Sequence, residues 1–233
     1  MKINYKSLPQ NDFFYNVIKI SASTILSAIA IAIALPIITL IFSADELGKY
    51  QLLISVITLF GVVSCFKYEM AIVLPKEDSV ARKVYNLCLY ALLVFCTILA
   101  FTLYSTSGLP LRWINAENLI VYYWFVPIGV LFFGFLEIIK YGLLRKKLFN
   151  EFSKARLYQV LLTQLLMITF GYLSPTLLSL FFAFVFGQII SSALFIKKSI
   201  ISIKKNENIK ILEIAQRFKK FPTFNTPMVF SNT

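Results

Sequence analysis

The feature that most constrains this chain is Leu157–Ile196, a stretch of forty residues without a charged side chain. A helix that crosses the hydrocarbon core of a bilayer needs about 20 mostly apolar residues. The stretch is therefore long enough for two such helices, and the turn-forming sequence GYLSP, Gly171–Pro175, lies near its middle. We predict two membrane-spanning helices, at 157–173 and 176–196, joined by a tight turn.

Four more charge-free runs precede this stretch. We predict spans at 20–42, 50–66, 84–106 and 118–136, with Pro36 kinking the first and Pro127 inside the fourth. The composition agrees, because 58% of the residues are hydrophobic and only 15% are charged, whereas a soluble domain carries about 25% charged residues. The predicted fold class is all-α integral membrane, a six-transmembrane-helix bundle over residues 1–198.

The basic residues predict how this bundle is oriented. The expected outer loops, 43–49 and 107–117 with the turn at Ser174, contain only Lys49 and Arg112. The other 21 of the 23 Lys and Arg residues lie on the side of both termini. Because loops rich in Lys and Arg stay in the cytoplasm, we predict that the N- and C-termini are cytoplasmic.

Several kinds of chemistry are disfavoured by what the sequence lacks. It has no histidine and no glycine-rich phosphate-binding loop, so we expect no enzyme activity, no cofactor and no metal site. Cys65, Cys88 and Cys96 lie in apolar runs without CxxC spacing, and we interpret them as small core residues. The net charge of +12 is spread between apolar runs instead of over one solvated face, so we expect no nucleic-acid partner.

One charged segment, Phe66–Leu87, lies between the second and third predicted spans. It is either a solvated loop whose charges set the orientation, or a segment in which Lys67, Tyr68 and Glu69 line a polar vestibule. The second interpretation is open because charged groups at membrane depth usually face protein or water instead of lipid.

Polar residues inside or beside the spans are further candidates for a substrate path. Ser23, Thr24 and Ser27 form a polar stripe that either lines a cavity or allows close helix packing beside alanines. Gln51 either contacts substrate or bonds to another helix. Glu137 is expected to pair with Lys140 at i,i+3. Glu69 and Glu137 are candidates for proton coupling, because carboxylates within the membrane often have this role.

The last part of the chain is first basic and then apolar. Residues 199–221 form a basic linker that is either an amphipathic helix on the cytoplasmic leaflet or a solvated segment. Residues 222–233 are apolar again and look like the start of a seventh span that stops short of about 20 residues. We therefore expect the chain to be incomplete.

A family resemblance rests on LGKYQLLISVITLFGVVSCFKYEMAIVLPKEDSVARKVYNL, Leu47–Leu87. It resembles the N-terminal signature of bacterial polysaccharide-biosynthesis flippases, which export O-antigen and capsule repeat units and belong to the multidrug/oligosaccharidyl-lipid/polysaccharide superfamily. The signature is carried here by Leu47, Gly48, Tyr50, Lys67, Tyr68, Glu69, Ala71, Ile72 and Pro75. Weaker matches are RKKLFN at 145–150, GQ at 187–188 and RFKKFPTFNTP at 217–227.

The resemblance implies a fold, a substrate and a location. Such proteins have two six-helix bundles around a central cavity, and they flip undecaprenyl-diphosphate-linked oligosaccharide across the bacterial inner membrane. The chain would then be the N-terminal half of a flippase. Its implied partners are the lipid bilayer, the lipid-linked oligosaccharide, a second six-helix half and the polysaccharide polymerase machinery.

Three other functions stay open. A cation-coupled drug exporter of the same superfamily would share the fold, and a non-functional truncated remnant would share the ancestry. A membrane-bound transferase would need a histidine or a cluster of carboxylates, and the predicted outer loops offer only Asp45, Glu46 and Glu117.

Overall fold

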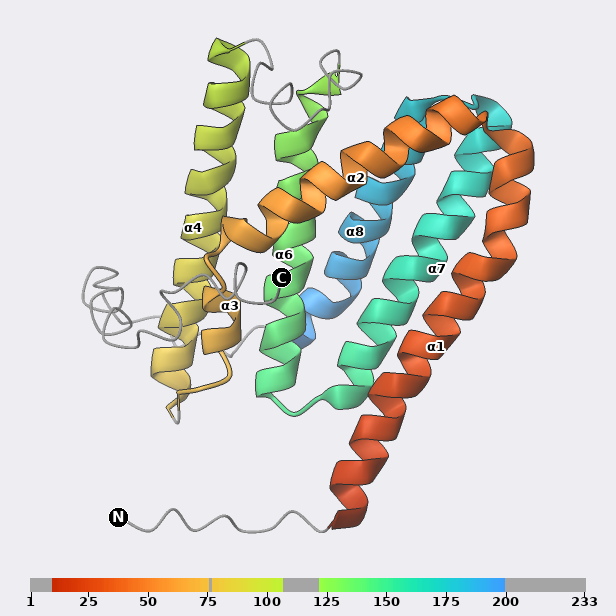
Figure 1. Cartoon of the computed structure of the whole chain (residues 1–233). Helices are drawn as coiled ribbons and strands as arrows, with labels where there is room; N and C mark the ends of the chain where they lie inside the picture. The colour runs from red at the N-terminus through yellow and green to blue at the C-terminus, as the bar shows by residue number, and fades with distance from the viewer. Residues whose placement is uncertain (1–9, 76, 107–121, 200–233) are drawn as a thin grey trace, which may run out of the picture.

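The computed structural model describes residues 10–75, 77–106 and 122–199, with side chains from residue 18 onward (Figure 1). Its regular structure is helical, and no strand occurs in these ranges. The helices are α1 (Gln10–Ile41), α2 (Ala44–Ser64), α3 (Tyr68–Ala71), α4 (Asp78–Ser105), α6 (Phe125–Arg145), α7 (Phe149–Leu173) and α8 (Leu177–Ser199). The prediction of an all-α fold is confirmed for the described part of the chain.

Five of the described helices are long and apolar enough to cross a membrane: α1 from Ile18 onward, α2, α4, α6 and α8. Helix α7 has 25 residues, but it is more polar because Arg156, Gln159 and Gln164 lie along it. Helices of this length and composition are those of a multi-pass membrane protein.

The long helices alternate in direction and pack as a slab. Figure 1 shows α4, α6, α8, α7 and α1 side by side, with α2 crossing obliquely in front of them. Each neighbouring pair in this row is in contact, and α2 packs mainly on α6 and more lightly on α8 and α4. Helix α2 therefore packs on the face formed by α4, α6 and α8.

The buried residues form three clusters, and α8 contributes to all of them. The largest joins α2, α4, α6 and α8 and contains Cys65, Cys88 and Cys96, as expected for small core residues. A second cluster joins α1, α7 and α8, and a third joins α6, α7 and α8. The outward faces carry many exposed Ile, Leu and Phe side chains, which is the surface that a bilayer would cover.

Glycines on α6 allow α2 and α4 to approach it closely. A Cβ atom on Gly129 would lie 2.4 Å from Cδ1 of Ile57, a fully buried residue of α2. A Cβ atom on Gly134 would lie 2.6 Å from Cδ1 of Leu92 on α4. Small residues commonly have this role where membrane helices pack.

The helix observed in the region of the fourth predicted span, 118–136, is Phe125–Arg145, so it continues beyond the predicted end. It begins where Pro127 falls in the first turn, a position at which the missing N–H of proline costs no helical hydrogen bond. It continues past residue 136 because Glu137 and Lys140 pair within the helix, with Nζ 2.7 Å from Oε1. This finding confirms their predicted i,i+3 pairing. Residues 118–121 lie outside the described residues.

Other helices begin before the spans that were predicted for them. Helix α2 starts at Ala44, not Tyr50, because Ser43 caps it: its Oγ accepts a hydrogen bond from the Glu46 N–H at 3.3 Å. Segment 43–49 is therefore largely helical and not a loop. Helices α4 and α7 begin at Asp78 and Phe149, and acidic residues in their first turns favour these starts. Helix α1 begins at Gln10, and the break between α7 and α8 falls at 174–176.

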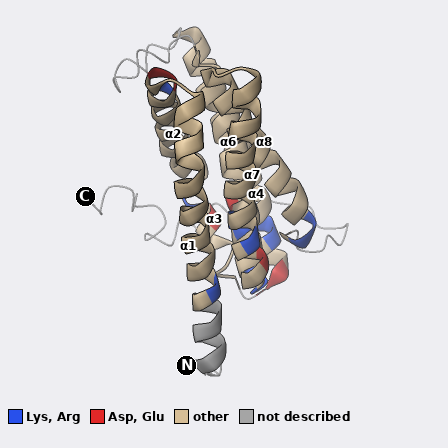
Figure 2. Cartoon of the chain, turned by 90° about the vertical axis from the view of Figure 1, so that its right-hand side faces the viewer, with Lys and Arg blue, Asp and Glu red and all other residues tan. Residues whose placement is uncertain are grey.

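Charge is concentrated at one end of the bundle, as Figure 2 shows. This charged end comprises the starts of α1, α4 and α7, the ends of α2, α6 and α8, and the segment with α3. It holds every Lys and Arg whose side chain is described except Lys49, which lies at the opposite end with Asp45 and Glu46. The predicted outer loop at 107–117 and the segments at 200–221 and 222–233 lie outside the described residues.

Candidate functional site

A pocket of about 260 Å³ lies at the charged end, between the end of α2, α3 and α6. Its volume is far above the roughly 10–15 Å³ that one water molecule needs. Its walls are formed by Gly61, Val62, Ser64, Cys65, Lys67, Glu69, Phe133, Gly134, Glu137 and Tyr141. The pocket therefore brings together three residues singled out in the sequence, Lys67, Glu69 and Glu137.

A sharp reversal of the chain places α3 against the pocket. Phe66 and Lys67, directly after α2, both have positive φ angles, 50° and 61°. This left-handed region is unfavourable for residues other than glycine, and such strain is often found at functional sites. Two consecutive residues in this conformation turn the chain back, so that α3 packs on α4 and α6.

Glu69 is the most enclosed charged group of the pocket. Its residue is 7% exposed, and its Oε2 atom has no hydrogen-bond partner among the described residues. Burial raises the pKa of the Glu69 carboxyl above its usual range; the Glu137 carboxylate also raises it, and the Lys67 ammonium opposes the shift. This carboxyl is therefore predisposed to hold a proton or to bind a cation or a hydroxyl group.

Glu137 faces the same pocket from α6 but is more exposed than Glu69. Its side chain is 34% exposed, whereas the side chain of its partner Lys140 is only 9% exposed. Lys140 does not line the pocket, and it pairs with Glu137 within α6. The pocket thus combines a carboxylate paired with Lys140, the Glu69 carboxyl, whose Oε2 atom has no partner among the described residues, and the half-buried Lys67.

The predicted stripe on α1 does not reach this pocket. Ser23 and Ser27 are buried, and their hydroxyls donate to carbonyls of their own helix, Ile20 and Ser23, at 2.8 and 2.7 Å. Thr24 donates to the Ile20 carbonyl in the same way. Because α1 packs on α7, these contacts favour the helix-packing interpretation over the cavity interpretation.

Gln51 lies on α2 and Tyr68 begins α3, and other residues of these two helices line the pocket. Gln51 is exposed on α2, and Ser55 and Thr58 follow it at i+4 and i+7 on the same helix face. This polar face runs along α2 toward the pocket at the end of the helix. Tyr68 is half-buried and packs against the largest buried cluster, although it does not line the pocket.

Tyr141, Gly134 and Phe133 line the pocket but were not predicted. All three share a face of α6 with Glu137, at i+4, i−3 and i−4. That spacing is the signal that could have found them, provided that the helix was known to continue past residue 136. Gln188 is fully buried on α8, away from the pocket lining.

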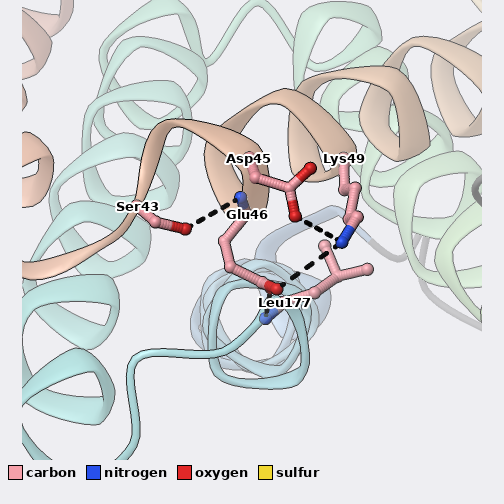
Figure 3. Close-up of polar contacts among 5 residues, drawn as sticks. All are labelled: Ser43, Asp45, Glu46, Lys49 and Leu177. Carbon is pink, nitrogen blue, oxygen red and sulfur yellow. Dashed lines mark hydrogen bonds and ion pairs between the residues drawn. The ribbon is translucent and has the colours of Figure 1, made fainter.

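A second polar cluster lies at the opposite end of the bundle, and Figure 3 shows its members. The Glu46 carboxylate accepts a hydrogen bond from the backbone N–H of Leu177, the first residue of α8. Lys49 pairs with Asp45 at 2.5 Å and lies 3.9 Å from Glu46. This cluster joins the start of α2 to the start of α8 and satisfies a backbone donor that the helix itself cannot satisfy.

Comparisons of the chain with protein-family models, curated proteins and solved structures find no match. The candidate site is therefore assigned from the positions of its own residues and not from a related protein. Among the described residues, no group of three or more His, Cys, Asp or Glu is placed to hold a metal ion.

Proposed function

We propose that this chain is part of a transporter that moves lipid-linked oligosaccharide across a bacterial inner membrane. The observation that carries the proposal is the pocket of Lys67, Glu69 and Glu137 at the charged end of an apolar helical bundle. Ionisable residues at membrane depth usually mark a substrate or ion path. The resemblance of segment 47–87 to the polysaccharide flippases supplies the substrate class.

The chemistry of the pocket suits a sugar head group. A sugar that enters a membrane protein loses hydrogen bonds to water, and protein donors and acceptors must replace them. The pocket is lined by two carboxylate residues, a lysine and Tyr141. The exposed Gln51 on α2 would continue this path, because an exposed polar side chain is unfavourable against lipid.

The same proposal includes a topology of six spans with both termini in the cytoplasm. Helix α7 would be the sixth span, since it lies between α1 and α8 and matches their length. The charged end would then face the cytoplasm, in keeping with the preference of Lys and Arg for that side. Glu69 and Glu137 would couple transport to a cation.

A cation-coupled drug exporter is the second candidate, and the two carboxylates of the pocket favour it. Glu69 and Glu137 both face a space that could accept a cationic amine. Efflux of a fluorescent cationic dye from cells that express the chain would distinguish this function from oligosaccharide transport.

Flipping of a labelled substrate in vesicles tests the main proposal. The transporter that contains this chain is reconstituted with a fluorescent undecaprenyl-diphosphate-linked oligosaccharide, and the fraction in the outer leaflet is followed with a membrane-impermeant quencher. We expect transport above that of protein-free vesicles and a loss of about tenfold or more in Glu69→Gln. The matched control is Glu77→Gln, because Glu77 is exposed and does not line the pocket.

Two results would contradict the proposal. One is transport by the unaltered protein at the rate of protein-free vesicles. The other is an equal loss in both variants, which would mean that the pocket carboxylate has no special role.

A further inference from the structure

We propose that Arg145 is the positioning residue of the pocket. In this role it fastens the segment after α3 to the end of α6 and thereby holds Glu69 opposite Glu137. Its importance for transport rests on the proposed function, whereas its effect on the geometry of the pocket does not.

One guanidinium group contacts three parts of this segment. Nη1 of Arg145 donates to the carbonyl of Ile72 at 3.2 Å and to the carbonyl of Pro75 at 2.6 Å. Nη2 donates to Oδ1 of Asp78 at 2.8 Å. The side chain is 9% exposed, so its two carbonyl contacts are partly shielded from water, whereas Asp78 is exposed. Arg145 therefore joins the end of α3, the following turn and the first residue of α4.

Helix α3 needs such support because it has only four residues. A single helical turn is not stable by itself, and its last carbonyls have no partner within the helix. Ile72, the C-cap residue of α3, offers one of these carbonyls to Arg145. Packing of Ala71 and Ile72, both fully buried, supplies the rest of the attachment.

We call the Arg145 guanidinium and its three acceptors on Ile72, Pro75 and Asp78 the clamp. The spacing of residues along α6 links this clamp to the pocket. Glu137, Tyr141 and Arg145 follow one another at intervals of four residues, so they lie along one face of the helix. The first two line the pocket and the third holds the segment beyond it. Glu69 lies three residues before Ile72, so a shift of this segment changes the distance between the two carboxylates.

Lysine cannot reproduce this arrangement. A guanidinium is a planar fork of five donors that can serve two carbonyls and a carboxylate together, whereas an ammonium is a compact charge on a flexible stem. Arg145→Lys keeps the positive charge near Asp78 but loses the planar arrangement of donors. The variant therefore shows how much of the effect depends on hydrogen-bond geometry and how much on charge.

Thiol reactivity beside the pocket provides the test. In a chain with Cys65→Ala and Cys88→Ala, Lys67→Cys introduces a reporter on the pocket wall. The native Cys96, 7% exposed within α4, reports on general loosening of the bundle. Both thiols react with N-ethylmaleimide in lipid nanodiscs, and mass spectrometry follows each of them separately.

We expect Arg145→Ala to raise the reaction rate at position 67 about tenfold while the rate at Cys96 stays within about twofold. Arg145→Lys should give an intermediate rise of roughly threefold, and it keeps the test informative if the alanine variant does not fold. Asp78→Asn is the matched control, because Asp78 is 78% exposed and both carbonyl contacts remain; its rate should stay within about twofold.

Unchanged reactivity at position 67 in the two Arg145 variants would overturn the proposal. So would an equal rise at positions 67 and 96, because Arg145 would then stabilise the bundle and not the pocket. No substrate is present in this measurement, so its outcome is independent of whether the protein transports oligosaccharide.

Discussion

Glu69 combines burial, an unpaired carboxyl oxygen and a raised pKa in one side chain. A carboxyl whose pKa is higher in the folded state binds its proton more readily there than in the unfolded chain. It therefore lowers the free energy of unfolding as the pH rises from the ordinary carboxyl pKa, 4.5, through the raised value. A group placed in this way opposes stability at neutral pH, which is typical of a functional residue.

We predict that Glu69→Gln stabilises the protein at neutral pH and not at acidic pH. The neutral amide removes the cost of an ionised buried group, so the melting temperature of the variant should exceed that of the parent at pH 7 and approach it near pH 4. Thermal unfolding of the detergent-solubilised protein across this range measures the difference. In Glu77→Gln the exposed side chain should leave the parental profile unchanged, and a Glu69→Gln profile parallel to the parental one would contradict the prediction.

The Glu137–Lys140 pair should respond unequally to loss of its two members. Glu137→Met leaves the buried Lys140 ammonium without its partner, and we expect a loss of roughly 2 kcal/mol in the free energy of unfolding. Lys140→Met leaves a carboxylate that is partly exposed and should cost less. Chemical denaturation of both variants and of the double variant measures this asymmetry, and equal losses would argue against it.

At the scale of elements, the contact between α2 and α6 depends on a glycine that accepts no side chain. A methyl group on Gly129 would overlap Ile57 along its length, since the Cδ1, Cγ1 and Cγ2 atoms lie at 2.4, 2.9 and 3.3 Å. We predict that Gly129→Ala lowers the free energy of unfolding by about 1–3 kcal/mol, the usual range for overpacking.

The control for this prediction lies on α2 itself. A Cβ on Gly48 would meet no atom within 4 Å, so Gly48→Ala should be neutral or stabilise the helix by up to about 1 kcal/mol. Denaturation midpoints of the two alanine variants give the comparison. Similar midpoints for both would mean that α2 can move away from α6 without cost.

The centres of the helices could be predicted from the sequence, and their ends could not. Charge-free intervals mark where a helix can meet hydrocarbon, so each predicted span overlaps one of the long helices. The ends were misplaced because charges were taken as boundaries. Glu137 and Lys140 pair inside α6, and Glu151 favours the first turn of α7, so both helices extend into charged sequence.

The pocket was only partly predictable for a related reason. Lys67, Glu69 and Glu137 were recognisable as charges beside apolar runs. Their proximity depends on two left-handed residues and on a contact of Arg145 with a carbonyl 73 positions away. Neither feature leaves a periodic pattern in the sequence.

At the scale of the whole molecule, the position of α7 decides the number of spans. If α7 crosses the membrane, its two ends lie on opposite sides, so Lys154→Cys and Tyr172→Cys should react with an impermeant maleimide from opposite faces of oriented vesicles. Both side chains are exposed, at 49% and 75%, so reactivity reports on the side of the membrane and not on burial. Reaction of both from one face would reduce the number of spans to the five apolar helices.

The uneven distribution of charge also has an electrical consequence. The described part of the charged end holds twelve basic and five acidic side chains, a net of seven positive charges. Moving one elementary charge through a membrane potential of 100 mV takes about 2.3 kcal/mol, so seven would take roughly 16 kcal/mol. With this end on the negative side, the potential of an energised membrane therefore resists any inversion of the bundle.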